Sequence, residues 1–288
     1  MENNEIENNK KKTFLFVIIL LIVLIVCLIL YSRYVSTSGL TVIEQSIVDK
    51  ELPDSFNGFK IAQFADIHYG NTTSMKEIKK MVKKINELNP DILVFTGDLF
   101  DEEIKIREED VTNLKEELAK LDASIQKYAV KGDQDYNYET EFETIFKYAN
   151  FNILENSNEF IYYKGTTPIK VVGTTSLLKS EIDYTNAFKI LGDEEEYFTI
   201  LFSHEPKIVE QLTDYKVNVI LSAHSLGGSI SLPFVGGLIK MKGADNYLKG
   251  YYETNNIKMY VNSGIGTQTY KFRFFNRPSI NLYRLYNY

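Results

Sequence analysis

DILVFTGDLFD, residues 91–101, is an apolar run of strand length that ends in a glycine and two aspartates. A similar run, KIAQFADIH at residues 60–68, precedes it and also ends in polar residues. Between them, residues 74–88 carry apolar side chains at the spacing of an amphipathic helix, and Pro90 ends that pattern. A strand, a helix and a second strand in this order predict an α/β fold. Polar residues that follow the strands then converge at the carboxyl edge of a sheet.

The same alternation of strand and helix patterns continues along the chain, with no internal repeat and no low-complexity linker. We therefore expect one α/β domain over residues 41–288. Its further strands are expected at residues 41–48, 127–130, 160–163, 169–172, 199–202, 217–221, 258–261 and 279–285, and its further helices at 108–122, 139–149 and 206–212.

An unbroken apolar run from Phe14 to Leu30 follows three lysines, which predicts a signal anchor across a membrane. The run is longer than the apolar part of a cleaved secretory signal, and no A-x-A-like site follows it. The positive-inside rule places the N-terminus in the cytoplasm of a single-pass cell-membrane protein. We expect a cytoplasmic tail at 1–12, a span at 13–32, a linker at 33–40 and an extracytoplasmic domain at 41–288.

Charge and cysteine content narrow the function classes further. Residues 1–40 hold four basic and three acidic residues, so the net charge of −7 leaves −8 for the rest of the chain. A domain of that sign is a poor binder of nucleic acid, which needs clustered Lys and Arg. Cys27 is the only cysteine and lies in the apolar run, so a disulfide within one chain is excluded.

All three histidines of the chain follow apolar runs of strand type. His68 comes after residues 60–65, His204 after 199–202 and His224 after 217–221. Histidine is the commonest metal ligand, and aspartates follow the neighbouring strands. The pattern therefore predicts a metal site at the carboxyl edge of the sheet.

The motifs together resemble those of the calcineurin-like metallophosphoesterase family, closest to its membrane-anchored bacterial branch. The family pattern is D-x-H, G-D-x-x-D, G-N-H-[DE], a lone H, and G-H-x-H. The matching elements in this chain are Asp66-x-His68, Gly97-Asp98-x-x-Asp101, Gly132-Asp133-Gln134-Asp135, His204 and Ala223-His224-Ser225-Leu226. The resemblance covers residues 41–288 and implies a four-layer αββα sandwich of two mixed sheets, preceded here by one transmembrane helix.

The resemblance also implies one or two divalent metal ions, Mn, Fe, Zn or Mg, bound by six residues. Asp98 would bridge two ions and position the nucleophile. Asp66 and His68 would bind the first ion, and the second would be bound by Asp133, His204 and His224. Asp101 is expected to support the site and not to bind metal.

Three positions depart from the family pattern. Asp133 replaces asparagine and could still bind metal, although an ordinary loop carboxylate is an equal alternative. Gln134 replaces the catalytic histidine and cannot donate a proton at neutral pH, a loss that typically costs on the order of 10²–10⁴ in rate. Leu226 replaces a histidine ligand of the first ion. Tyr136 is a candidate replacement proton donor.

Two hypotheses of function follow. The first is a membrane-anchored, metal-dependent phosphoester hydrolase of reduced activity that acts outside the cytoplasm on a lipid-linked or envelope-derived phosphoester. The second is a catalytically inactive relative that serves as a binding or scaffold module at the membrane surface. Retention of Asp66, His68, Asp98, His204 and His224 favours the first hypothesis.

Overall fold

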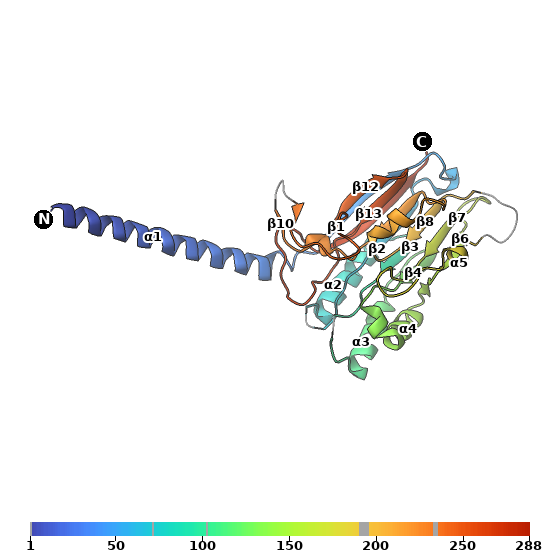
Figure 1. Cartoon of the computed structure of the whole chain (residues 1–288). Helices are drawn as coiled ribbons and strands as arrows, with labels where there is room; N and C mark the ends of the chain where they lie inside the picture. The colour runs from blue at the N-terminus through green and yellow to red at the C-terminus, as the bar shows by residue number, and fades with distance from the viewer. Residues whose placement is uncertain (1, 71, 102, 190–195, 233–235) are drawn as a thin grey trace.

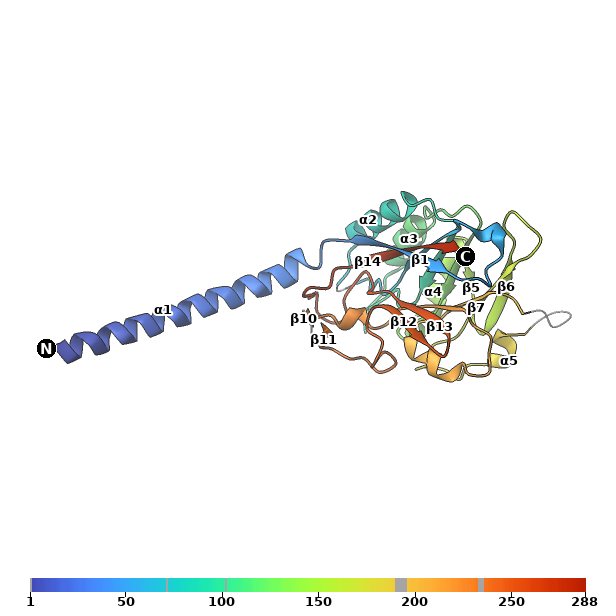
Figure 2. The same cartoon turned by 90° about the horizontal axis from the view of Figure 1, so that it is seen from above.

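Two six-stranded mixed sheets pack face to face, with helices on both outer faces (Figures 1 and 2). The computed structural model describes residues 2–70, 72–101, 103–189, 196–232 and 236–288. In spatial order, the first sheet consists of β1 (Thr41–Val48), β14 (Ser279–Tyr286), β2 (Lys60–Phe64), β3 (Ile92–Thr96), β4 (Gln126–Val130) and β5 (Asn152–Ile153). The second consists of β12 (Gly250–Thr254), β13 (Ile257–Val261), β9 (Val219–Ser222), β8 (Thr199–Phe202), β7 (Ile169–Gly173) and β6 (Ser157–Ile161).

Strands β2 to β5 run parallel, as do β7, β8, β9 and β13, so both sheets have a common carboxyl edge. Antiparallel strands lie toward the margins: β14 against β2, β12 against β13, and β6 against β7. β1 pairs in parallel with β14. Because β14 runs opposite to β2, β1 begins at the edge where β2 ends. The chain therefore enters the domain at the carboxyl edge of the first sheet.

Strand β3 shows why the sequence selects this layered arrangement. Its side chains alternate between two cores: Ile92 and Val94 face the second sheet, and Leu93 and Phe95 face the helices. All four are fully buried, and burial of each such side chain is worth roughly 1.5–3 kcal/mol. A strand covered on both faces needs an unbroken apolar run, which residues 92–95 supply.

Helices cover the two outer faces of the sandwich. The first sheet is covered by α2 (Met75–Asn86), α3 (Glu108–Leu118) and α4 (Glu139–Tyr148), and the second by α5 (Tyr184–Ala187) and the 3₁₀ segment η4 (Pro206–Gln211). Figure 2 shows α2 and α3 on one side of the sheets and α5 on the other. The amphipathic pattern of α2 buries its apolar stripe, and Glu77 caps the helix by accepting a hydrogen bond from Ser74 N–H at 2.9 Å.

The structure confirms the predicted four-layer fold and nearly all predicted elements. The helix predicted at 206–212 was wrong in type, because this segment forms a 3₁₀ helix. Helix α5 was not predicted, nor were strands β5 and β12 or the two-stranded sheet of β10 (Ser231–Leu232) and β11 (Gly236–Gly237). β5 has only two residues, and the GYYET sequence of β12 has little apolar alternation. Such short or polar elements form through pairing with a neighbouring strand, which local periodicity does not report.

The N-terminal helix α1 (Glu2–Leu30) projects away from the domain and continues into a π-helical turn at Tyr31–Val35 (Figure 1). The helical stretch Ile6–Val35 is long and apolar enough to cross a membrane. The last residue of the expected span and the first part of the expected linker both pack against the domain. Ser32 O accepts a hydrogen bond from Arg273 N–H at 3.2 Å, and Ser36 and Thr37 are buried.

Candidate metal centre

The predicted site residues come together between the carboxyl edges of the two sheets. Those from the first sheet follow β2, β3 and β4, and those from the second follow β8 and β9. Parallel pairing in register aligns the strand ends, so that Asp66 N–H donates to Gly97 O at 2.8 Å. Six predicted ligands form two clusters that share Asp98: Asp98, Asp133, His204 and His224 in one, and Asp66, His68 and Asp98 in the other.

Four of these residues have a left-handed backbone. The φ angles of Asp66, His68, Asp98 and His224 lie between 47° and 68°. Such a conformation costs free energy for a residue with a Cβ atom, and it persists where the surrounding structure enforces it. Gly97 has φ 96°, and a Cβ atom there would lie 2.5 Å from His204 Nδ1. The tight turn after β3 therefore requires glycine, and it turns Asp98 into the space between the sheets.

Cluster one, defined by Asp98, Asp133, His204 and His224, has its ligand atoms close together. His204 Nε2 lies 3.3 Å from Asp98 Oδ2 and 3.4 Å from Asp133 Oδ1. His224 Nδ1 lies 3.3 Å from Asp133 Oδ1 and 3.1 Å from His204 Nε2. Two carboxylates and two imidazoles in this arrangement form a nitrogen and oxygen donor set of the kind that divalent cations bind.

Backbone carbonyls orient both imidazoles of cluster one. His204 Nδ1 lies 2.7 Å from Thr96 O, and His224 Nε2 lies 2.8 Å from Lys242 O. A ring nitrogen that donates its proton to a carbonyl leaves the other nitrogen free to accept a metal. The nitrogens that face the carboxylates, His204 Nε2 and His224 Nδ1, are the ones left free.

Cluster two, defined by Asp66, His68 and Asp98, is less complete. His68 Nε2 lies 3.9 Å from Asp98 Oδ2, and His68 Nδ1 lies 3.9 Å from Asp101 Oδ1. Within the described part of the chain, both carboxylate oxygens of Asp66 are buried and make no hydrogen bond. Burying a polar group without a partner is costly, so two such oxygens aimed into one space indicate that a cation belongs there.

The pKa values of the metal-free centre also indicate a space that favours a cation. Burial raises the pKa of Asp66 to about 6. Burial lowers the pKa of His204, but the charge of Asp98 and the hydrogen bond to Asp133 outweigh it, so that this pKa lies well above its usual value. Burial likewise opposes a net rise in the pKa of His224, where Asp133 is the main cause of the increase. The carboxylates therefore favour positive charge in this space, and metal ions can supply it.

Asp135 supports the bridging residue, a role that sequence reasoning did not assign. It is fully buried, and it accepts hydrogen bonds at 2.8 Å each from the backbone N–H groups of Asp98, Leu99 and Gly132. These bonds join the loop after β3 to the loop after β4. Its signal in the sequence was its match to the last position of the family motif G-N-H-[DE].

Gln134 and Leu226, two of the three departures from the family pattern, lie at the centre itself. Gln134 is buried and donates from Nε2 to Asp133 Oδ2 at 2.7 Å, while its backbone N–H donates to Asp98 Oδ1 at 2.9 Å. Leu226 is buried beside Asp66: a methyl carbon built on Gly264 would lie 2.7 Å from Asp66 Oδ2 and 3.0 Å from Leu226 Cδ2. A hydrocarbon therefore borders cluster two where a histidine of the family pattern would stand.

Tyr136, the candidate proton donor, has its hydroxyl engaged elsewhere. It accepts a hydrogen bond from Ser176 N–H at 3.2 Å and lies 3.4 Å from Ser180 Oγ. Ser176 Oγ also donates to the buried carboxylate of Glu205, the residue after His204. The tyrosine thus anchors the loop at 174–180 beside the centre.

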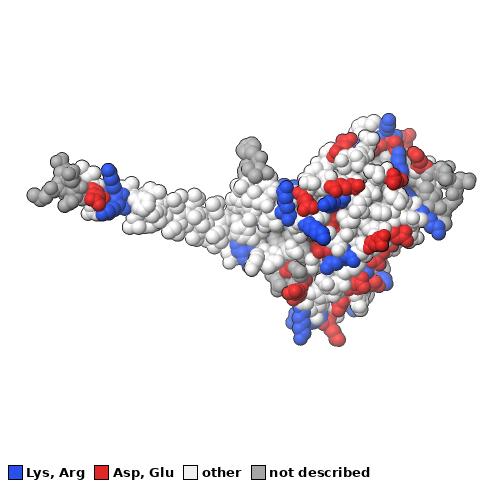
Figure 3. Space-filling view, viewed as in Figure 1, with Lys and Arg blue, Asp and Glu red and all other residues white. Residues whose placement is uncertain are grey.

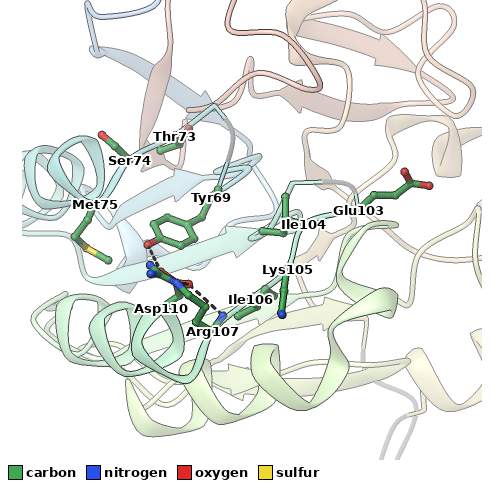
Figure 4. A pocket seen from close by; sticks show the side chains of 11 residues that line it. Tyr69, Thr73, Ser74, Met75, Glu103, Ile104, Lys105, Ile106, Arg107 and Asp110 are labelled. Carbon is green, nitrogen blue, oxygen red and sulfur yellow. Dashed lines mark hydrogen bonds and ion pairs between the residues drawn. The ribbon is translucent and has the colours of Figure 1, made fainter.

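A cavity of about 500 Å³ begins at Tyr69, one residue after His68 (Figure 4). Tyr69 points across it toward α3, where its hydroxyl donates to Asp110 Oδ1 at 3.0 Å. Asp110 in turn pairs with Arg107 at 2.9 Å. The cavity adjoins the loop after His68 but none of the six candidate ligands lines it, and its lining combines charged side chains such as Lys105 and Arg107 with apolar ones.

Comparison with known proteins identifies relatives of the whole domain. The family model described as calcineurin-like phosphoesterase matches residues 59–228, which contain all six candidate ligands. The metallophosphoesterase YkuE of Bacillus subtilis (strain 168) is 32% identical over 258 residues, which cover 88% of this chain and 88% of that protein.

Two further relatives carry more specific names. The UDP-2,3-diacylglucosamine pyrophosphatase LpxG of Chlamydia muridarum (strain MoPn / Nigg) is 27% identical, with 82% of this chain and 87% of that protein covered. A transmembrane protein with metallophosphoesterase domain from Danio rerio is 27% identical over 66% of this chain and 45% of its own length.

Proposed function

The chain belongs to the calcineurin-like phosphoesterase family and is a metal-dependent phosphoesterase, and we propose that it works as a membrane-anchored enzyme outside the cytoplasm. Helix α1 supports the anchor, because Ile6–Val35 is long enough to cross a bilayer. The lysines at 10–12 support a cytoplasmic N-terminus, with the domain on the other side of the membrane.

One observation carries the proposal: two clusters of potential ligands share Asp98 in a buried space where Asp66 has both oxygens unpaired among the described residues. We propose that Asp98, Asp133, His204 and His224 hold one divalent ion and that Asp66 and His68, with Asp98, hold a weaker one. Divalent ions in such a site would lower the pKa of a water molecule and offset the charge of the phosphoryl oxygens. The mixed nitrogen and oxygen donors suit Mn, Fe, Zn or Mg.

The residues around the centre would determine the efficiency of the enzyme. Asp98 is held by Asp135 through the backbone, so it can position the reacting groups with little reorganisation. Gln134 donates to Asp133 and cannot protonate a leaving oxygen, and we propose that solvent supplies that proton. Leu226 offers no lone pair to an ion beside Asp66. We therefore propose reduced activity, with the ion at cluster two, beside Asp66 and His68, bound less tightly than the ion at cluster one.

The substrate class follows from the location of the domain. A domain tethered by α1 meets phosphoesters of membrane lipids and of the envelope at high local concentration. The similarity to LpxG is consistent with this class, because by its name that relative acts on a diacylated sugar nucleotide. We propose a lipid-linked or envelope-derived phosphoester as the substrate.

Hydrolysis of bis(p-nitrophenyl) phosphate by the full chain in detergent, titrated with Mn²⁺, tests the activity. Wild type and Asp214→Ala, a change at an exposed site, should turn over substrate, and chelator should abolish this. Asp98→Ala should be inactive, because it removes the residue shared by both clusters. Metal binding measured by calorimetry, without turnover above that of Asp98→Ala, would contradict an enzymatic role and indicate a binding module.

A further inference from the structure

An exposed apolar surface surrounds the point where helix α1 enters the domain. We name it the apolar rim, and it consists of Tyr34, Val35, Leu238, Ile239, Tyr270 and Phe275, whose side chains are between 46% and 78% exposed. In Figure 3 the uncharged surface of α1 continues onto the adjoining end of the domain. Single exposed apolar side chains are common on protein surfaces, whereas a group of neighbouring ones such as this indicates an interaction site.

The parts of the rim are held together by direct contacts. Tyr31, in the π-helical turn that follows α1, packs on Phe274 and Phe275 with ring centroids 6.1 Å and 6.4 Å apart. Ser231 N–H donates to Phe274 O at 2.8 Å, which joins the chain before Leu238 to the same loop. A cavity of about 600 Å³ opens between these segments, lined by Arg33 together with Ile239 and Tyr270.

We infer that the apolar rim inserts into the surface of the lipid bilayer that α1 crosses, so that the domain is docked on the membrane and not only tethered to it. The inference rests on the membrane anchor of the proposed function. The rim lies at the level where α1 leaves the apolar span, which is the depth of the headgroups. Tyrosine and other aromatic side chains are favoured at that depth. Arg33 and Lys240 are exposed beside the rim and suit anionic headgroups.

Docking through the rim would orient the metal centre. Strand β1 begins at the carboxyl edge of the first sheet, the edge at which Asp66 and Asp98 lie. The loops that form the rim also touch the centre: Lys242 O lies 2.8 Å from His224 Nε2, and Ile239 N–H donates to Gly228 O at 3.3 Å. The edge that carries the metal ligands therefore faces the membrane, and a lipid phosphoester can reach it without leaving the bilayer.

The chain contains no tryptophan, so the emission of one introduced tryptophan can be excited selectively over that of the tyrosines. Full-length Tyr270→Trp and Phe275→Trp are reconstituted into vesicles of phosphatidylcholine and phosphatidylglycerol, some with brominated acyl chains. Both should show blue-shifted emission and loss of intensity with brominated lipid. Leu20→Trp in α1 reports the anchor. Tyr162→Trp, 61% exposed and placed after β6 at the opposite edge, is the matched control and should stay unquenched.

The outcomes separate the inference from its premise. Quenching of Leu20→Trp without quenching of Tyr270→Trp and Phe275→Trp overturns the docking and leaves the anchor intact. An unquenched Leu20→Trp overturns the anchor. Equal quenching at Tyr162→Trp would show that the domain has no fixed orientation. A blue shift that grows with protein concentration in detergent would assign the rim to a second copy of the chain. Equal quenching at Tyr162→Trp and a blue shift that depends on protein concentration would each overturn docking through the rim.

Discussion

Replacing Asp66 by asparagine should change stability in opposite directions with and without metal. The side chain is fully buried, and neither carboxylate oxygen makes a hydrogen bond among the described residues. The nearest imidazole nitrogen, His204 Nε2, lies 4.0 Å from Asp66 Oδ1. In the metal-free protein, desolvation of this charged carboxylate lowers the stability of the fold, whereas asparagine has the same shape and carries no charge. Asp66→Asn should therefore stabilise the metal-free fold while it weakens metal binding.

The magnitude follows from the pKa of Asp66, which burial raises from 3.8 to about 6 in the folded protein. A folded-state pKa above the unfolded value means that the folded protein binds the proton more tightly. The stabilisation of the fold by protonated Asp66 is therefore complete below pH 3.8 and is lost as the pH rises through about 6. At 1.36 kcal/mol per pKa unit, wild type loses about 3 kcal/mol over this window. The free energy of unfolding of Asp66→Asn should not show this decrease.

The assay is urea unfolding of the full chain in detergent, followed by tyrosine fluorescence between pH 4 and pH 8 in the presence of chelator. Above pH 6, Asp66→Asn should exceed wild type by up to about 3 kcal/mol, and the difference should shrink toward pH 4. Asp214→Asn, at an exposed site, is the control and should stay within about 0.5 kcal/mol of wild type. At a metal concentration 100 times the dissociation constant, wild type should gain about 2.7 kcal/mol and the variant less.

Two results would refute this reasoning. If Asp66→Asn is less stable than wild type in chelator at pH 7, the carboxylate stabilises the fold and is not held in place for a cation. If metal stabilises both proteins equally, Asp66 does not contribute to binding.

Three other changes test the supports of the centre and its departures from the family. Asp135→Ala leaves three buried N–H groups without an acceptor, at about 1–3 kcal/mol each, so urea unfolding should show a loss of about 3–9 kcal/mol; a loss below 1 kcal/mol would contradict the role. Gln134→His combined with Leu226→His should raise turnover of bis(p-nitrophenyl) phosphate with Mn²⁺ by about 10²–10⁴, and an unchanged rate would show a remodelled pocket. Arg273 is fully buried and donates from its guanidinium to Ser263 O and Gly266 O, in the loop whose Gly266 N–H donates to Asp66 O. Arg273→Lys should lower the free energy of unfolding by roughly 3–6 kcal/mol, because lysine cannot replace this forked donation; an unchanged midpoint in the same assay would show that these bonds are dispensable.

Most of the fold could be predicted because its signals are local. The apolar run at 92–96 and the helical spacing in 75–86 each lie within a dozen residues, and both appear where the sequence placed them. The segment at 206–211 has a proline at its first turn but forms 3₁₀ turns. Strands β5 and β12 were not predicted, because they form through pairing with β4 and β13 and have no strand pattern of their own.

The sequence by itself determined the residue types of the centre and their order after successive strands. Their places after strand ends predicted that the three histidines and the neighbouring aspartates would gather, because parallel strands in register bring their ends together, and the resemblance to the family implied the full ligand set. The sequence also determined the apolar helix, since 17 consecutive apolar residues are a local property.

Only the tertiary structure decided how these side chains meet. It selected the ring nitrogens of His204 and His224 that face the carboxylates, through carbonyls of Thr96 and Lys242 that are remote in sequence. It also revealed the support by Asp135 and brought the end of α1 to the edge that carries the ligands. Hydrogen-bond partners, desolvation and the orientation of an edge depend on contacts between distant segments. Periodicity along the chain carries no record of those contacts.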